Sequence, residues 1–152
     1  MDEPHWLSPV EMRAWRGYLG LVRLLDYRLS RDLQEDSGLS LPDYEILVRL
    51  ADAPHRRLRM TELAQGAMVS KSRLSHQMNR MEARGLASRQ GCPTDRRGAF
   101  AVLSDAGFDV LVAAAPGHVA AVRRHLFDRL TPTQVETLGD LSDAVISGLT
   151  DQ

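Results

Sequence analysis

The stretch VSKSRLSHQMNRMEARGLASRQGCPTDRRGAFAVLS, residues 69–104, decides the fold. It opens with a serine suited to cap a helix, continues with helical periodicity, and reaches a glycine at Gly85 that suits a helix end. Two short runs follow, LASRQ and AFAVLS, on either side of a turn that contains Asp95, Arg96 and Arg97. Such runs predict an antiparallel hairpin directly after the helix.

The predicted helix has two different faces. An advance of about 100° per residue puts Leu74, Met78 and Met81 within one narrow arc. The opposite side has small or hydrogen-bonding residues and arginines but no carboxylate, as a helix that enters the DNA major groove requires. The alternative is an ordinary amphipathic surface helix. The residues that we predict to contact DNA from this helix are Ser70, Lys71, Ser72, Arg73, Ser75, His76, Asn79 and Arg80.

The hairpin after this helix has the position of a wing. The narrow minor groove of DNA attracts inserted arginine, and a carboxylate can hold a guanidinium in a fixed fork. We expect Asp95 to hold Arg97 in this way and Arg96 to reach the DNA backbone. The alternative is a plain surface ion pair, which contributes about 0–1 kcal/mol.

Charge is distributed unevenly along the chain. Residues 55–100 contain ten basic and three acidic side chains, a net +7, whereas the whole chain carries −1 and the remainder therefore carries −8. A basic middle between acidic arms indicates that the middle binds a polyanion, although a solvated basic surface would give the same count.

Helices are predicted on both sides of the basic segment, which makes the fold class mainly α with a small β-hairpin. We expect a long helix from the capping box at Ser8 to about Asp36, and a second that starts after Ser40 and stops before Pro54. HRRLRM, residues 55–60, reads as one edge strand. The remaining expectations are that Thr61 caps a short helix, that Ser104 caps a helix running to roughly Arg129 with Pro116 kinking or dividing it, and that TPTQ at 131–134 opens the last helix.

In the segments VSKSRLSHQMNRMEARGL, TDRRGAFAVLSDAG and LTPTQVETL the chain resembles the MarR family of bacterial transcriptional regulators. The resemblance implies one domain over residues 1–152, with a winged helix-turn-helix at about 40–104 and dimerisation helices at about 8–36 and 105–150. It also implies a homodimer that represses transcription from a pseudo-palindromic operator, with recognition helices about 34 Å apart. Many members of the family release DNA when a small aromatic or phenolic ligand binds, and others respond to thiol oxidation or metal.

The trigger in this chain has two candidates. Trp15, Tyr18, Arg23 and Tyr44 suit an anionic aromatic ligand in a cleft between the arms and the DNA-binding lobe, unless they are core or dimer-interface residues. Cys92 is the only thiol and could make the protein sensitive to oxidation. The absence of a second cysteine to resolve a sulfenate within the chain favours the alternative, an unreactive cysteine. The spacing of the histidines predicts no metal site, and we expect no cofactor.

Other function classes have little support. The chain has no glycine-rich phosphate loop, nucleophile elbow or metal triad, so we expect it not to be an enzyme. No apolar run approaches the roughly 20 residues that span a bilayer, and the acidic N-terminus lacks the features of a signal peptide. We therefore predict a cytoplasmic, nucleoid-associated partner of double-stranded DNA with no membrane contact, or alternatively a helical dimerisation module that has lost DNA binding.

Overall fold

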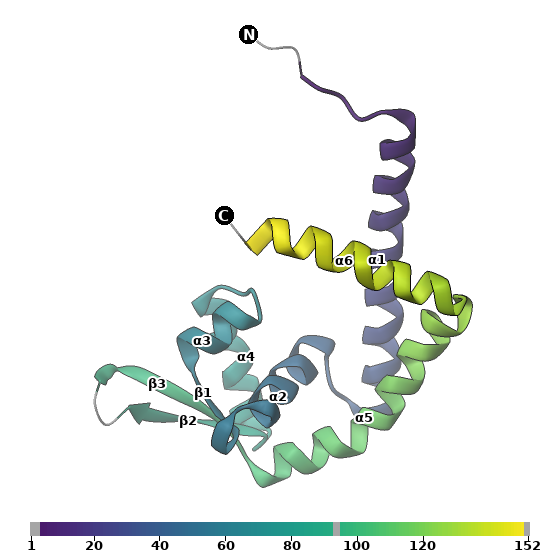
Figure 1. Ribbon diagram of the computed structural model, residues 1–152. Coiled ribbons are helices and arrows are strands. Elements are labelled where there is room, and N and C mark those ends of the chain that lie inside the picture. The colour runs from purple at the N-terminus through teal and green to yellow at the C-terminus, as the bar shows by residue number, and fades with distance from the viewer. Residues whose placement is uncertain (1–3, 93–94, 151–152) are drawn as a thin grey trace. The chain divides into compact units, whose positions relative to one another are not determined.

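The structure is a computed structural model that describes the backbone of residues 4–92 and 95–150, and the side chains of 4–91 and 98–150. It is mostly helical with one small antiparallel sheet, as predicted (Figure 1). The elements in chain order are α1 (Pro9–Ser37), α2 (Leu41–Asp52), the 3-10 turn η1 (Pro54–Arg56), β1 (Arg57–Arg59), α3 (Met60–Gly66), α4 (Lys71–Ala83), β2 (Ala87–Cys92), β3 (Asp95–Leu103), α5 (Asp105–His125), the 3-10 turn η2 (Phe127–Arg129) and α6 (Pro132–Thr150).

The chain forms two compact units. The central unit is Asp32–His118, and the terminal unit combines Met1–Arg31 with Val119–Gln152. Helices α1 and α5 each cross from one unit to the other.

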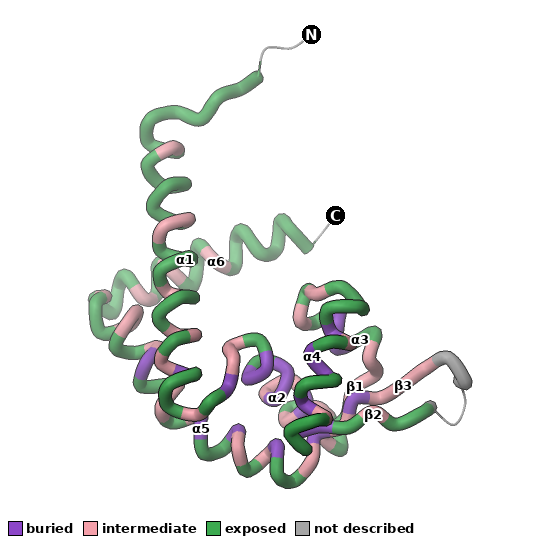
Figure 2. The backbone as a smooth tube through the Cα atoms, turned by 180° about the vertical axis from the view of Figure 1, so that it is seen from behind, coloured by how far each residue is buried: buried purple, intermediate pink, exposed green. Residues whose placement is uncertain are grey.

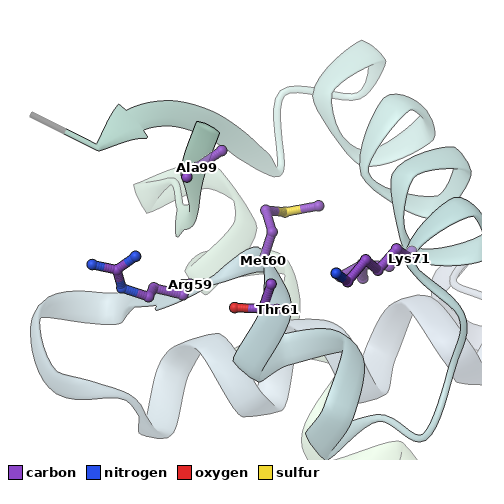
Figure 3. Close-up of a pocket in the computed structure, with 7 residues that line it drawn as sticks. Arg59, Met60, Thr61, Lys71 and Ala99 are labelled. Carbon is purple, nitrogen blue, oxygen red and sulfur yellow. The ribbon is translucent and has the colours of Figure 1, made fainter. Parts of the chain in front are cut away.

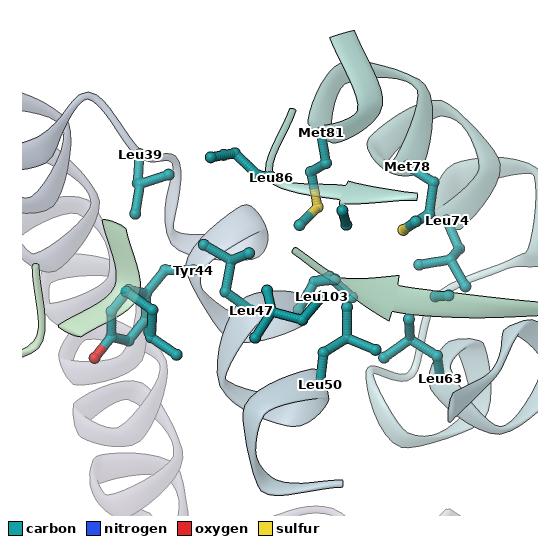
Figure 4. Packing of buried hydrophobic residues seen from close by; sticks show 14 of the residues in the cluster. Leu39, Tyr44, Leu47, Leu50, Leu63, Leu74, Met78, Met81, Leu86 and Leu103 are labelled. Atoms are coloured by element: carbon teal, nitrogen blue, oxygen red, sulfur yellow. The ribbon is translucent and has the colours of Figure 1, made fainter. Parts of the chain in front are cut away.

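One apolar core holds the central unit together. Figure 4 shows side chains from α2, α3, α4 and the sheet gathered around Leu103, and Figure 2 shows the buried positions along α2 and α4. Full burial of a leucine or methionine side chain contributes roughly 1.5–3 kcal/mol. The largest fully buried side chains are Leu39, Ile46, Leu47, Leu50, Leu63, Leu74, Met78 and Met81.

The sheet ties the wing to the helices. Its strand order is β1-β3-β2 with antiparallel pairing throughout. The edge strand predicted at residues 55–60 is confirmed for Arg57–Arg59, whereas His55 and Arg56 belong to a 3-10 turn and Met60 starts α3. In the register Arg57 pairs with Val102 and Ala87 pairs with Leu103. Pairing of β2 with β3 is irregular between Gly91 and Cys92.

The junction between β3 and α5 is closed by a serine and a glycine. Ser104 Oγ donates to the carbonyl of Gly85 at 2.6 Å and accepts from the backbone N of Gly107 at 2.9 Å, which confirms Ser104 as a helix cap. A Cβ atom on Gly107 would lie 2.0 Å from the carbonyl oxygen of Leu86. Only glycine therefore allows α5 to pass so close to the start of β2.

Most of the predicted helix boundaries are confirmed. The capping boxes at Ser8 and Thr131 and the serine caps at Ser40 and Ser70 all form. Gly38 and Gly85 follow helix ends with positive φ values of 65° and 69°, where glycine avoids backbone strain.

Two expectations about the helix boundaries were wrong. Arg59, not Thr61, precedes α3, and its backbone N donates to Glu62 Oε2 at 3.2 Å, so the glutamate supplies the cap from inside the helix. Helix α5 ends at His125 rather than near Arg129, because Leu126 leaves helical geometry and a separate 3-10 turn follows.

Pro116 does not divide α5. The helix continues from Asp105 to His125 with Pro116 inside it and exposed to solvent. A proline removes one backbone hydrogen bond, and the exposed position leaves the carbonyl that loses its partner open to water.

The expectation about membrane spans also needs correction. Residues 105–129 are long and apolar enough to cross a membrane by length and composition alone. Core helices of soluble proteins pass the same test, and α5 contributes Leu111 and Ala114 to the core of the central unit.

Candidate nucleic-acid interface

Helix α4 presents the two faces that its sequence predicts. Leu74, Met78 and Met81 are buried in the core. The cap is formed by Ser70, whose Oγ accepts from the backbone N of Arg73 at 3.2 Å. Ser75 is half-buried, and the other predicted contact residues are exposed: Ser70, Lys71, Ser72, Arg73, His76, Asn79 and Arg80.

Arg80 is held by an acidic residue that the sequence analysis did not identify. Its Nη2 lies 3.1 Å from Oδ1 of Asp43 near the start of α2. The Asp43 side chain is 7% exposed and that of Arg80 is 55% exposed. The buried carboxylate therefore anchors a guanidinium that still faces solvent on the predicted DNA side of α4.

A polar hollow of about 410 Å³ lies beside this ion pair, between α2 and α4. The buried Gln77 contributes to its wall, and Gln77 Oε1 accepts no hydrogen bond from the described residues. Gln77 was not among the predicted site residues, although helical geometry puts it only about 40° from Met81 and hence beside the apolar arc. The residues that line the hollow are Pro42, Ser72, Arg73, His76, Gln77 and Arg80.

Arg89 connects the wing to α4. It lies on β2, and its Nη2 is 3.1 Å from Oε2 of Glu82 and donates to the carbonyl of Ser75 at 3.3 Å. The same nitrogen donates to Oδ1 of Asn79. The Glu82 carboxylate also accepts from the backbone N of Arg89 at 2.7 Å, so it binds strand β2 through both main chain and side chain. In the sequence Arg89 contributes only to the net charge of the basic segment, because no local pattern indicates a contact between residues that are ten positions apart.

A second hollow, of about 290 Å³, lies where α3, α4 and β3 meet. Figure 3 shows the Lys71 ammonium directed toward Thr61 and the Arg59 guanidinium pointing away from it. The lining thus includes two cationic residues from different elements, Arg59 of β1 and Lys71 of α4. The full lining is Arg59, Met60, Thr61, Lys71, Leu74, Gly98 and Ala99.

Several basic residues that contribute to the net +7 lie against aromatic rings. The Arg57 guanidinium lies 4.3 Å from the centre of the Phe100 ring, and that of Arg56 lies 3.7 Å from the centre of the Phe108 ring. Arg56 also pairs with Asp105 at 3.2 Å. These contacts stabilise the base of the sheet. The number of basic residues in the segment is therefore larger than the number whose side chains are available to contact DNA.

The predicted wing-tip contacts lie outside the side chains that the structure describes. Strand β3 begins at Asp95, so Arg96 and Arg97 follow within that strand. The expected pairing of Asp95 with Arg97, and any reactivity of Cys92, stay predictions.

The residues predicted to bind a ligand occur in both units. Trp15 and Tyr18 of α1 are exposed and stack with ring centres 6.1 Å apart, and Arg23 on the same helix is also exposed. Tyr44 belongs to the core of the central unit, and its ring centre is 4.6 Å from that of His118. Burial raises the pKa of Tyr44 and lowers the pKa of His118 from their ordinary values.

The terminal unit has much apolar surface in the single chain. No residue of α6, Pro132–Thr150, is buried. Leu141, Val145 and Leu149 are among its exposed large side chains. A mainly apolar hollow of about 380 Å³ lies between Leu21 of α1 and Leu138 of α6.

No group of three or more histidine, cysteine, aspartate or glutamate side chains in the described part of the chain is placed to hold a metal ion. The exposed face of α4 instead offers hydrogen-bond donors and arginines, which suit an anionic polymer.

The chain is similar to known transcriptional regulators. A model of the MarR family matches residues 37–98. Sco3205, a MarR family transcriptional regulator from Streptomyces coelicolor solved in complex with DNA, is 50% identical and superimposes with a TM-score of 0.92 over 98% of this chain and 93% of its own. AbsC, a MarR family transcriptional regulator from the same organism, is 45% identical with a TM-score of 0.90 over 98% of this chain and 100% of its own. The HTH-type transcriptional repressor YetL of Bacillus subtilis is 33% identical over 107 residues, which cover 68% of this chain and 64% of YetL.

Proposed function

Because the chain belongs to the MarR family of DNA-binding transcriptional regulators, we propose that it is a homodimeric repressor of a pseudo-palindromic operator. The observation that carries this proposal is the exposed face of α4. It combines Ser72, Arg73, His76 and Asn79 with the anchored guanidinium of Arg80, and it includes no carboxylate. In the proposed complex α4 enters the major groove and the wing lies along the neighbouring backbone or minor groove.

Dimerisation is supported by the apolar surface of the terminal unit. Leu141, Val145 and Leu149 are each more than half exposed and recur on α6 at steps of four residues. In a monomer this apolar stripe is exposed to water, and exposed apolar patches of this kind mark interaction surfaces. A second copy would cover it, and two recognition helices would then meet two half-sites about one DNA turn apart.

Repression is proposed from the name of YetL, a repressor that is 33% identical to this chain over 107 residues, which cover 68% of this chain and 64% of YetL. We further propose that a small aromatic or phenolic ligand releases the DNA. The support is the exposed Trp15–Tyr18 stack, with the cation of Arg23 on the same helix. Oxidation of Cys92 is the second candidate trigger, favoured by its place at the end of strand β2 of the wing.

The protein would act in the cytoplasm, bound to the chromosome in the nucleoid. This follows from the family's role as DNA-binding transcriptional regulators, because the operator that the protein binds is part of the chromosome.

The decisive experiment is selection from a pool of random DNA duplexes, followed by gel shifts on the enriched sequence at several salt concentrations. We expect an inverted repeat and an affinity that falls steeply with salt, because phosphate contacts release counterions. Failure to enrich any sequence would favour the alternative, a helical dimerisation module without DNA binding. Affinity independent of salt would contradict the electrostatic role assigned to the arginines.

A further inference from the structure

Arg89 is a cation of the wing whose charged group turns inward to α4. Its side chain is 30% exposed, and its Nη2 meets three acceptors from α4: Glu82 Oε2, the Ser75 carbonyl and Asn79 Oδ1. Glu82 holds the arginine in place through both its guanidinium and its backbone N. The Arg89 guanidinium is therefore bound by other residues of the protein. Any effect of Arg89 on DNA binding must act through a neighbouring residue.

That neighbour is Asn79, which is exposed on the predicted DNA face. A guanidinium only donates hydrogen bonds, so of the two ends of the amide it can bind only the carbonyl oxygen. The contact thus settles the orientation of the Asn79 amide by chemistry: Oδ1 faces Arg89, and the NH2 group takes the other direction.

We propose that Arg89 is a positioning residue that turns Asn79 into a hydrogen-bond donor, and that Asn79 thereby selects guanine at one base pair of each half-site. The inference rests on the proposed function and adds a base preference to it. In the major groove guanine presents two acceptors, N7 and O6, whereas cytosine presents a donor.

The proposal departs from the usual behaviour of asparagine. A free asparagine pairs with adenine, because Oδ1 accepts from the adenine N6 amino group while Nδ2 donates to N7. That pairing needs both ends of the amide at one base edge. With Oδ1 held by a charged donor on the wing side, adenine offers Asn79 only one acceptor and guanine offers two.

The test compares selected DNA sequences for the intact protein and its variants. Wild type, Asn79→Ala, Arg89→Gln and Arg89→Met are each taken through selection from random duplexes. Arg84→Met is the matched control, because Arg84 caps the C-terminal end of α4, is exposed, and loses the same charge. Thermal unfolding of each variant shows whether the selected protein is folded. If Arg89→Met does not fold, Arg89→Gln provides the test, because an amide has no charge and can accept as well as donate.

In the wild type we expect one guanine per half-site whose enrichment is lost in Asn79→Ala, by between about five-fold and about 150-fold. In both Arg89 variants the guanine preference should fall and adenine should be accepted at the same base pair, while binding to random DNA changes no more than in Arg84→Met. The double variant Asn79→Ala/Arg89→Met should match Asn79→Ala at that base pair, because the two residues act through one contact.

Three results would overturn the inference while leaving the proposed function intact. They are an adenine at the Asn79-dependent base pair of the wild type, no base pair that depends on Asn79, and a guanine preference that both folded Arg89 variants retain. Failure of the wild type to enrich any sequence would instead remove the proposed function itself.

Discussion

Arg80 and Asp43 join the recognition helix to α2 through an ion pair of 3.1 Å in which the carboxylate is buried and the guanidinium is half exposed. The two residues are 37 positions apart in the chain. The pair holds a predicted DNA-contacting cation in one place before DNA arrives, so less side-chain entropy is lost on binding.

Arg80→Met should destabilise the central unit by about 1–3 kcal/mol, because it leaves the Asp43 carboxylate buried without its cation. Urea unfolding measures this change, and the double variant Arg80→Met/Asp43→Asn should recover most of the loss since no buried charge remains. Arg84→Met, at an exposed arginine of the same helix, should change stability by less than about 0.5 kcal/mol. If the double variant is no more stable than Arg80→Met, the ion pair is not the cause.

Arg97→Ala should weaken binding to the selected operator while leaving the oligomeric state unchanged, because we assign Arg97 to the minor groove and not to an interface. Gel shifts and sedimentation give the two measurements. Arg57→Ala removes the same charge and serves as the control, because the Arg57 guanidinium lies over the Phe100 ring and Arg57 is not among the predicted DNA contacts. An operator affinity equal to that of wild type would exclude the role proposed for Arg97.

Gly107→Ala should destabilise the protein by about 1–3 kcal/mol or more, as expected for overpacking, because the new methyl group would meet the Leu86 carbonyl at 2.0 Å. Thermal or urea unfolding measures it. In Gly17→Ala the added methyl group meets nothing within 4 Å in the single chain, and the change should be neutral or slightly stabilising because alanine favours helix. Equal stability of the two variants would show that the junction between the wing and α5 relaxes easily.

Lowering the pH should destabilise the fold through His118. Burial lowers the pKa of His118 below its ordinary value of 6.5, so between the two values the unfolded chain binds more protons than the native one. Its contribution to stability is therefore complete above pH 6.5 and is lost as the pH falls toward the native pKa. Melting temperatures between pH 5 and pH 8 test this, and His118→Gln should flatten the acidic side of the profile. An identical profile for the variant would assign the dependence to other groups.

Leu149→Glu should shift the protein from dimer toward monomer, because it introduces a charge into the apolar stripe of α6, where Leu149 is 70% exposed in the single chain. Sedimentation at several protein concentrations measures the shift. Asp143→Glu lies on the same helix and keeps its charge, so it should leave the assembly unchanged. A Leu149→Glu protein that remains fully dimeric would place the interface elsewhere, for example on the residues before Arg13.

Local patterns in the sequence were sufficient for most of the fold. Capping serines, helix-ending glycines and the spacing of Leu74, Met78 and Met81 act within a few residues of chain, so the boundaries of α4 and its buried side could be predicted. The prediction failed at Thr61 and near Arg129, where competing caps and a local change of backbone angles set the boundary.

The sequence by itself determined the winged helix-turn-helix, the basic middle of the chain and the division of α4 into a buried and an exposed face, because these depend on periodicity and composition. Only the tertiary structure decided how those residues are held. Asp43 anchors Arg80 from α2, and Arg89 turns the Asn79 amide from β2. Both contacts join residues that are ten or more positions apart and that no local rule pairs, because their distance in space is set by how the helices and the sheet pack around the shared core.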